Sequence, residues 1–238
     1  MKLQNEISQL KAQIKTMEQI ECKKAFYYAE LSHDLRQPLQ AMRIFLSLLK
    51  DESLTPTQAS LTTKIEETAN HLNLWIENLL EMTKLESGGL KKKETRFSLN
   101  KMLTELAREY QAIATYRKQK LFYSGKDIKI KTDKILLERI IRNILHNALK
   151  YSRGEIKLNW YTLNNSIKII IKDNGLGLKP QECRQLFEAF YQCPRHQEQG
   201  TGLGLAIVKE LTDILGISLD LKSKWRKGTI FVLKLPKK

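Results

Sequence analysis

The feature that most constrains this 238-residue chain is a heptad repeat of apolar residues that begins almost at its N-terminus. The repeat runs through Leu3, Ile7, Leu10, Ile14, Met17, Tyr28, Leu31, Leu35, Pro38, Met42, Phe45 and Leu49, with a polar gap at Glu21 and Lys24. Apolar residues at alternating steps of four and three form one stripe along a helix, and that stripe packs against another helix. The pattern predicts a long helix over residues 1 to about 50.

A second heptad stripe follows a short turn. The segment from Asp51 to Thr57 contains Pro56 and is typical of a turn. The next stripe consists of Leu61, Ile65, Leu72, Trp75, Leu79 and Met82. Two such helices form a hairpin with more apolar surface than two helices can cover, so we expect a homodimer in which two hairpins make a four-helix bundle. Ser87-Gly88-Gly89 ends the second helix, and Lys91 to Lys93 form a charged linker.

His33 occupies an unusual place in the first helix. With Leu31 at position d and Leu35 at position a, His33 falls at f, the position furthest from the partner helix. Asp34 can hold one ring nitrogen as a donor, which leaves the other free to act as a nucleophile or base. Pro38 removes a backbone donor and loosens the helix just beyond. An isolated surface histidine beside an aspartate would ordinarily be a solvated side chain, so its interpretation depends on the rest of the chain.

From Arg96 onward the pattern is mixed α and β. We expect helices from Leu99 to Lys118, from Thr132 or Asp133 to Tyr151, and from Leu203 to Leu215. Strands are expected at 121–124, 128–131, 155–163, 166–173, 218–222 and 228–235. The whole chain is therefore of the α+β class, with a coiled-coil helix at 1–24, a dimerisation domain at 25–90 and an α/β domain at 91–238.

Composition excludes several classes of protein. A hydrophobic share of 42% and a charged share of 28% are ordinary for a globular protein. We find neither a run long enough for a membrane helix nor a signal peptide, so we expect a cytoplasmic chain, or the cytoplasmic portion of a membrane-bound sensor. Three cysteines with no metal spacing predict neither disulfides nor a zinc site. A net charge of +15 favours an acidic protein, an anionic membrane or nucleic acid as a partner.

Three motifs in the second half carry ligand-binding chemistry. Asp173-Asn-Gly-Leu-Gly177 places a carboxylate and two glycines at the end of a strand, where a planar base could dock against the backbone. Gly200-Thr-Gly-Leu-Gly204 leads into a helix whose N-terminal amides could bind phosphate. Asn143 and Asn147 lie on one helix face, and an amide oxygen there could ligate Mg²⁺.

Together these motifs resemble a known family. Asn147, Asp173 to Gly177, Leu186-Phe-Glu-Ala-Phe190 and Gly200 to Gly204 resemble, in order, the N, first glycine, F and second glycine boxes of the GHKL (Bergerat) ATP-binding fold. His33-Asp-Leu-Arg-Gln-Pro-Leu39 resembles the H box of sensor histidine kinases. The resemblance implies a helical dimerisation domain followed by an α/β sandwich that binds ATP and Mg²⁺.

The resemblance also implies a role for each site residue. Asn147 would ligate Mg²⁺, and Asp173 would accept a hydrogen bond from the adenine amino group. His33 would attack the γ-phosphate, Asp34 would orient or deprotonate it, and Gln37 would place a water for dephosphorylating the partner. The remaining residues would surround ATP: Asn143, Lys150, Tyr151, Gly175, Gly177, Phe190, Arg195, Thr201, Gly202, Leu203, Gly204 and Thr229. Residues 178–200 would form a lid over ATP, which Phe187 and Phe190 pack down.

One position separates the kinase interpretation from a close rival. Hydrolytic members of the superfamily have a glutamate four residues before the magnesium asparagine, where this chain has Asn143, which cannot act as a general base. We therefore expect ATP-dependent phosphorylation of His33 and transfer to an aspartate of a response regulator receiver domain, with an upstream sensor domain absent from this chain. The alternative is an ATP-regulated scaffold or nucleic-acid-binding protein, although we expect no nucleic acid partner.

Overall fold

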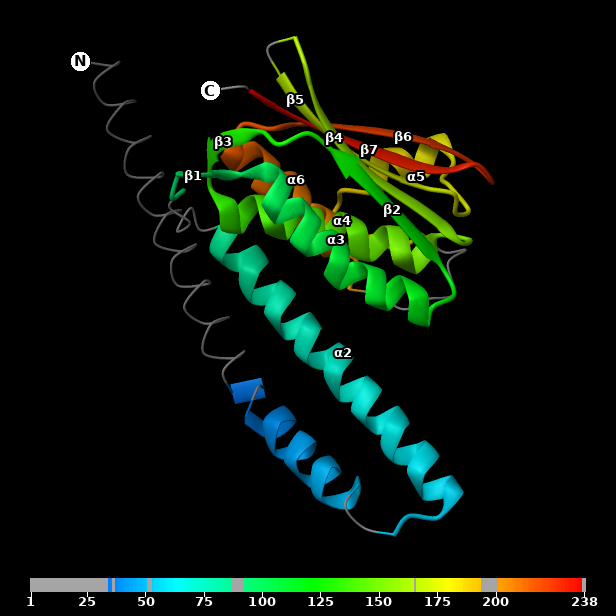
Figure 1. Cartoon of the computed structure of the whole chain (residues 1–238). Helices are drawn as coiled ribbons and strands as arrows, with labels where there is room; N and C mark the ends of the chain where they lie inside the picture. The colour runs from blue at the N-terminus through cyan, green and yellow to red at the C-terminus, as the bar shows by residue number, and fades with distance from the viewer. Residues whose placement is uncertain are drawn as a thin grey trace, which may run out of the picture. The chain divides into compact units, whose positions relative to one another are not determined.

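The computed structural model describes residues 34–35, 37–50, 53–86, 92–164, 166–193 and 201–236, and the chain separates into two compact units, residues 1–90 and 91–238 (Figure 1). Several predicted features lie outside the described residues, among them the coiled-coil segment 1–24, the histidine His33, the helix end at 87–89 and the lid residue Arg195. Within the described ranges, no helix has the length and hydropathy needed to cross a bilayer.

The first unit contains two helical stretches joined by a short turn. Residues 37–50 are helical, and α2 spans Pro56–Glu86. The side chains of Thr55 and Gln58 each accept a hydrogen bond from the other residue's backbone amide, which holds the start of α2. Leu39 packs against Ala69 and Ile76 of α2. The expected helical hairpin is confirmed in this part of the chain, although α2 begins at Pro56, inside the predicted turn.

The residues of the predicted heptad stripe do not make the contact within this hairpin. Leu39 and Leu46, seven residues apart and outside that stripe, are buried instead. The predicted members Leu35, Met42, Phe45 and Leu49 remain 42%, 40%, 64% and 48% exposed. Predicted members of the α2 stripe behave the same way: Leu61, Ile65 and Leu72 are exposed. Each helix therefore carries two apolar stripes, and only one of them is used inside the hairpin.

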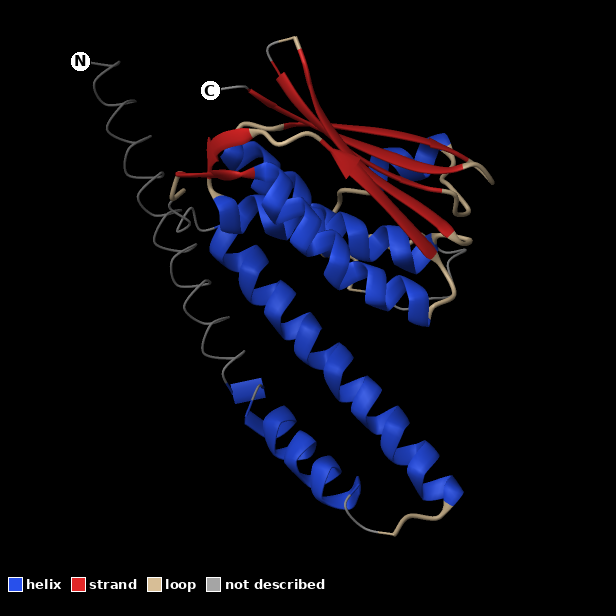
Figure 2. Cartoon of the chain, in the orientation of Figure 1, coloured by secondary structure: helices blue, strands red, loops and turns tan. Residues whose placement is uncertain are grey.

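The second unit is a sheet covered on one face by helices. Its elements are β1 (Thr95–Ser98), α3 (Leu99–Tyr116), β2 (Lys120–Gly125), β3 (Lys129–Thr132), α4 (Lys134–Tyr151), β4 (Glu155–Leu163), β5 (Ser166–Asp173), α5 (Pro180–Gln185), α6 (Gly204–Leu215), β6 (Ser218–Lys224) and β7 (Gly228–Pro236). Five strands form a sheet in the order β2-β4-β5-β7-β6, in which only the β2–β4 pair is parallel. Figure 2 shows α3, α4 and α6 together beneath this sheet. The predicted α+β class is confirmed.

Strand alternation decides which face of the sheet is covered. In β5, Ile167, Ile169 and Ile171 are buried, whereas the residues between them are partly open. These isoleucines meet fully buried residues of α4, such as Ile140 and Ile144, in one core. Burying each aliphatic side chain contributes roughly 1.5–3 kcal/mol. The core thereby fixes α4 on the sheet, with its C-terminal end near the end of β5.

Two short elements were not expected from the sequence. β1 pairs with β3 in a separate two-stranded sheet. The segment predicted as a polar lid contains α5, whose N-terminal Pro180 and Glu182 fit a helix start. The other strands and helices of this unit agree with prediction to within two residues at each end.

Candidate functional site

Asp173 lies at the centre of the candidate site, at the C-terminal end of the central strand β5. Its side chain is only 6% exposed. Its Oδ1 accepts hydrogen bonds from the backbone amides of Gly175, at 2.8 Å, and Thr229, at 3.3 Å. Burial raises the pKa of the Asp173 carboxyl, because removal from water disfavours its charge, and the two amide donors oppose that shift. A buried carboxylate held at one oxygen leaves its other oxygen available to a ligand.

Glycines let the backbone close around Asp173. A Cβ on Gly175 would come within 2.0 Å of the Tyr151 carbonyl oxygen, and one on Gly228 within 2.0 Å of the Asp173 carbonyl oxygen. Gly177 has φ +62°, a conformation that other residues rarely adopt. Larger residues would push the end of α4 and the β5–α5 connection apart. The site therefore requires glycine here for close backbone approach.

Thr229, at the start of β7, borders Asp173, and its predicted role at the adenine remains a prediction. Its backbone amide, rather than its hydroxyl, contacts Asp173. The Thr229 hydroxyl lies 2.9 Å from the hydroxyl of Ser223 on β6, which also accepts from the amide of Leu178. Asn174 is likewise structural, since its Oδ1 accepts from Ser152 and from the amides of the α4–β4 turn. Neither Ser223 nor Asn174 was singled out from the sequence.

The opposite end of the site is where α4 meets the start of α6. A Cβ on Gly204, the first residue of α6, would lie 3.3 Å from Oδ1 of Asn143. Thr201 accepts at its hydroxyl from the amide of Leu203, at 3.1 Å, which shapes the turn before the helix. The Asn143 amide oxygen and the free amides at the helix N-terminus thus face the same small volume. Such a pairing suits a phosphate group and a hard cation.

α4 joins the two ends of the site. Tyr151 at its C-terminus borders Gly175, and Asn143 borders Gly204, with Asn147 midway between them. Eight residues of helix separate the two ends by about 12 Å. The Lys150 ammonium lies 5.2 Å from the centre of the Tyr151 ring. The sequence-predicted residues of α4, of the β5 end and of the α6 start therefore come together along one helix.

Phe190 lies at the surface of the described part of the chain, and its predicted packing on the lid remains a prediction. Its side chain is 65% exposed, and its backbone has φ +65°. Contact with the second glycine motif comes from its backbone instead, because the Phe190 amide donates to the Gly202 carbonyl at 3.1 Å. A Cβ on Gly202 would collide with the Phe190 backbone. The F motif thus meets the second glycine motif through main-chain atoms.

Within the predicted lid, Cys193 is tied back to α5. Cys193 is buried and its thiol lies 2.9 Å from Oε1 of Glu182, itself buried. The other oxygen of Glu182 accepts from the amide of Lys179. This buried pair joins residues eleven apart, which sequence inspection did not detect.

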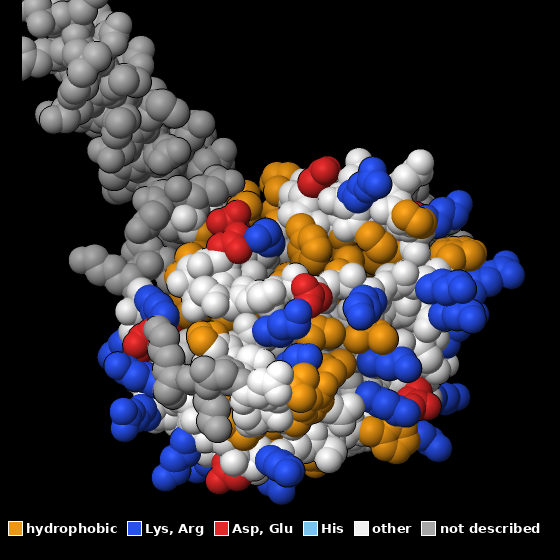
Figure 3. All heavy atoms as spheres, turned by 90° about the horizontal axis from the view of Figure 1, so that it is seen from above, with side chains coloured by type: hydrophobic (Ala, Val, Ile, Leu, Met, Phe, Trp, Pro, Cys, Tyr) orange, Lys and Arg blue, Asp and Glu red, His pale blue; other side chains and the backbone are white. Residues whose placement is uncertain are grey.

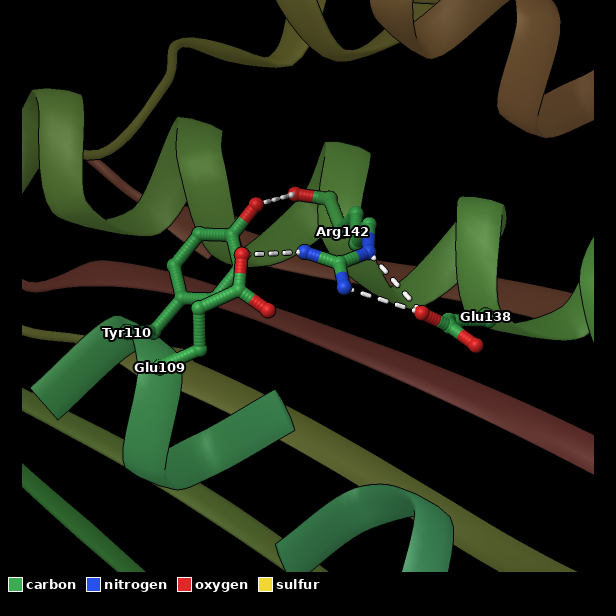
Figure 4. A network of polar contacts seen from close by, with 4 residues as sticks. All are labelled: Glu109, Tyr110, Glu138 and Arg142. Carbon is green, nitrogen blue, oxygen red and sulfur yellow. Dashed lines mark hydrogen bonds and ion pairs between the residues drawn. The ribbon is translucent and has the colours of Figure 1, made fainter. Parts of the chain in front are cut away.

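A polar cluster holds α4 against α3 next to Asn143 (Figure 4). Arg142 bonds to Glu109 of α3 at 2.6 Å and to Glu138 of α4 at 2.9 Å. Arg142 holds the pKa of Glu109 below its usual range through this hydrogen bond. The Tyr110 hydroxyl donates to the Arg142 carbonyl oxygen at 3.2 Å. The Glu138–Arg142 pair follows the i, i+4 rule and could have been found from sequence, but its α3 partners could not.

In the helical unit, Asp34 and Gln37 are both helical and exposed. The expected phospho-acceptor His33 precedes them but lies outside the described residues. Their predicted roles remain predictions.

The fold and site define a class. A two-layer α/β domain with a buried aspartate at one end of α4 and a helix N-terminus at the other is a nucleotide-binding domain. Residues 132–238 match the family described as "Histidine kinase-, DNA gyrase B-, and HSP90-like ATPase", and residues 23–88 match "His Kinase A (phospho-acceptor) domain". The chain therefore carries the ATP-binding and phospho-acceptor domains of a histidine kinase catalytic core.

Similar proteins agree with this assignment. The sensor protein GacS of Pseudomonas syringae pv. syringae is 32% identical over 90% of this chain and 25% of its own length. The autoinducer 2 sensor kinase/phosphatase LuxQ of Vibrio harveyi is 29% identical over 90% of this chain and 26% of its own length. The chain thus spans about a quarter of these two relatives. The crystal structure of full-length ShkA in complex with AMPPNP is 25% identical, with a TM-score of 0.75, and the match covers 88% of this chain and 45% of that one.

Proposed function

We propose that this chain is a histidine kinase core that transfers the γ-phosphoryl group of ATP to His33 and then to an aspartate of a response regulator. The observation that carries the proposal is the buried Asp173 carboxylate and the Asn143–Gly204 contact at opposite ends of α4, in a chain that also has a phospho-acceptor domain. ShkA was solved with the ATP analogue AMPPNP, which supports ATP as the ligand.

Each residue has a defined task in the proposed reaction. Asp173 accepts a hydrogen bond from the adenine amino group, and Gly175 lets the base lie against the backbone. The N-terminal amides of α6 bind the phosphates, with Asn143 and Lys150 nearby, and Asn147 would ligate Mg²⁺. When bound, Mg²⁺ neutralises phosphate charge. Mg²⁺ prefers few protein ligands together with waters and phosphate oxygens, so a single amide ligand would be sufficient.

Phosphoryl transfer then needs positioning more than covalent machinery. A ring nitrogen of His33 forms a bond to the γ-phosphorus as the bond to the bridging oxygen breaks and ADP leaves. Asp34 orients the ring or takes its proton. Gln37 positions a water for dephosphorylating the partner. Arg195 contributes positive charge in the lid.

The helical unit supports a dimer as part of the proposal. One stripe is used within the hairpin, and the other exposes Met42, Phe45 and Leu61. Association of two hairpins into a four-helix bundle would bury the second stripe.

Labelling with γ-³²P-ATP and Mg²⁺ tests the function. We expect acid-labile, alkali-stable label on the parent chain, its loss in His33→Ala, and its retention in His71→Ala, a control on the same helical unit. Label should pass to a receiver domain that contains its aspartate and not to the Asp→Asn form. ATP binding without any label would instead favour the regulated scaffold. Because Asn143 cannot act as a base, His33→Ala should release little phosphate, and steady hydrolysis at the parent rate would contradict the proposal.

A further inference from the structure

The face of the five-stranded sheet opposite α3, α4 and α6 carries an ordered arrangement of charge. In Figure 3, lysine and arginine side chains surround hydrophobic ones on the face seen from above, with few acidic side chains among them. The charge of the chain is also uneven, because residues 91–238 contain 31 Lys and Arg against 14 Asp and Glu, whereas residues 1–90 contain 10 against 12. The unit with this face therefore carries a net charge of +17 and the other unit −2, so all of the excess positive charge belongs to it.

Strand register places the lysines in two rows. Directly opposed residues point to the same face of an antiparallel pair. Lys157 of β4 lies opposite Lys172 of β5, and Lys168 of β5 lies opposite Lys234 of β7. Between these rows, Ile170 of β5 lies opposite Val232 of β7. The face therefore has an aliphatic centre with a lysine pair on each side.

Like charges directly opposite one another destabilise a sheet, so the two lysine pairs are not explained by folding. Acidic neighbours compensate only in part. Glu155 pairs with Lys157 at 2.6 Å, and Asp220 pairs with Lys234. The Lys157 ammonium holds the pKa of Glu155 below its usual range, with Lys172 and Lys120 adding to the effect. Among the described residues, Lys168 and Lys172 make no ion pair.

We propose that this sheet face, defined by Lys157, Lys168, Ile170, Lys172, Val232 and Lys234, docks a protein surface on which carboxylates flank an apolar ridge. The aliphatic centre and charged margins have the arrangement of a protein interface, apolar in the middle and polar at the rim. The four lysines would steer and orient an acidic partner. This site is separate from the nucleotide site, whose residues lie at the ends of α4.

Two other anionic partners fit the face less well. Single-stranded nucleic acid is bound on sheets through successive stacked aromatic rings. Two exposed aromatic residues on this face, Phe122 and Tyr161, lie opposite Lys157 and Lys168, at opposite margins of the face. Ile170 and Val232 occupy the centre between the lysine pairs, so the rings do not form adjacent stacking positions. A membrane would have to contact those two short β-branched side chains, which are half-buried between longer lysines. A protein ridge can reach between the lysine rows, whereas a flat bilayer meets the lysines first.

The test uses the full chain and a synthetic helical peptide with a leucine stripe flanked by glutamates. We expect saturable binding by fluorescence anisotropy, weakened by added salt. Carbodiimide coupling, which joins lysine amines to carboxylates, should link the peptide to Lys157, Lys168, Lys172 or Lys234. Lys168→Glu/Lys172→Glu should weaken binding on the order of tenfold or more, whereas the charge-matched control Lys101→Glu/Lys134→Glu should change it less than about twofold.

Additional variants and ligands separate docking on this face from loss of folding and from binding of other anionic partners. ATP affinity, measured on every variant, reports that the domain remains folded. Ile170→Ser and a peptide with serines in place of leucines should each bind more weakly, because both remove the apolar contact. Failure of the peptide to bind, equal loss in the control variant, or cross-links elsewhere would overturn the proposal. Tighter binding of a uridine 20-mer or of phosphatidylserine/phosphatidylcholine vesicles through the same lysines would overturn it in favour of those partners.

Discussion

Substitution of Asp173 by asparagine should separate nucleotide binding from folding. The Asp173 carboxylate is 6% exposed, and its Oδ1 accepts from two backbone amides. An asparagine oxygen can accept the same two bonds, but its amide nitrogen would then present a donor to the adenine amino group. A hydrogen bond to a charged acceptor contributes about 1.5–3 kcal/mol. We therefore expect the Kd for ATP to rise about 10- to 100-fold.

The same substitution should leave the stability of the nucleotide-free protein unchanged or raise it. Because burial raises the pKa of Asp173, the folded state holds its proton more tightly than the unfolded state does. The free energy of unfolding therefore falls as the pH rises through the raised pKa and the carboxyl ionises. It increases again when the pH is lowered through the same range. Asp173→Asn removes this charge, so the melting temperature of the nucleotide-free variant at pH 7 should equal or exceed that of the parent.

Calorimetric titration with ATP and thermal unfolding with and without nucleotide would check both effects. At a ligand concentration 100 times its Kd, ATP should stabilise the parent by about 2.7 kcal/mol, and the variant by much less. Asp213→Asn is the control, since Asp213 is exposed on α6 and pairs with Lys209 at 2.7 Å. The reasoning would be refuted if Asp173→Asn bound ATP within about threefold of the parent, or lost about 2 kcal/mol or more of nucleotide-free stability.

Three further substitutions probe separate features. Gly204→Ala places a Cβ 3.3 Å from Asn143 Oδ1, so it should weaken Mg²⁺-ATP binding roughly tenfold in titrations, while alanine at a helix start leaves the melting temperature unchanged or higher; unaltered affinity would contradict the phosphate-end assignment. Tyr110→Phe removes the hydrogen bond to the Arg142 carbonyl oxygen and should lower the free energy of unfolding, measured in urea, by about 1 kcal/mol. An unchanged free energy of unfolding would show that this hydrogen bond does not stabilise the fold. Phe45→Glu should give monomers by light scattering, whereas a persistent dimer would exclude this stripe from the interface.

The strands that position the site could be predicted because their signals are local. β4 and β5 are β-branched and aromatic runs separated by Asn164, which adopts φ +54° in the turn. The start of α4 was also predictable, since Asp133 accepts from the amide of Leu136 three residues on. In contrast, β1 and α5 are four and six residues long, and short elements carry too few periodic positions to be detected.

The sequence did not allow us to predict which distant residue each side chain contacts. The glycine motifs identified Asp173, but the register of β5 with β7 decides that Thr229 contributes its amide rather than its hydroxyl. The same limit applies to the hairpin. Leu39 and Leu46 repeat every seven residues as regularly as the predicted stripe, so periodicity alone does not say which stripe the neighbouring helix covers.

α4 sets the separation between the two ends of the site. The helix is fixed to the sheet by its buried isoleucines and to α3 by Arg142, so the spacing between Asn143 and Tyr151 cannot change independently. A ligand that bridges Asp173 and the start of α6 must match the length of that helix segment. The glycines at both ends bring the backbone to the ligand, whereas the helix sets the separation. In the proposed function, recognition of the base and alignment of the phosphates would therefore both depend on this single rigid helix.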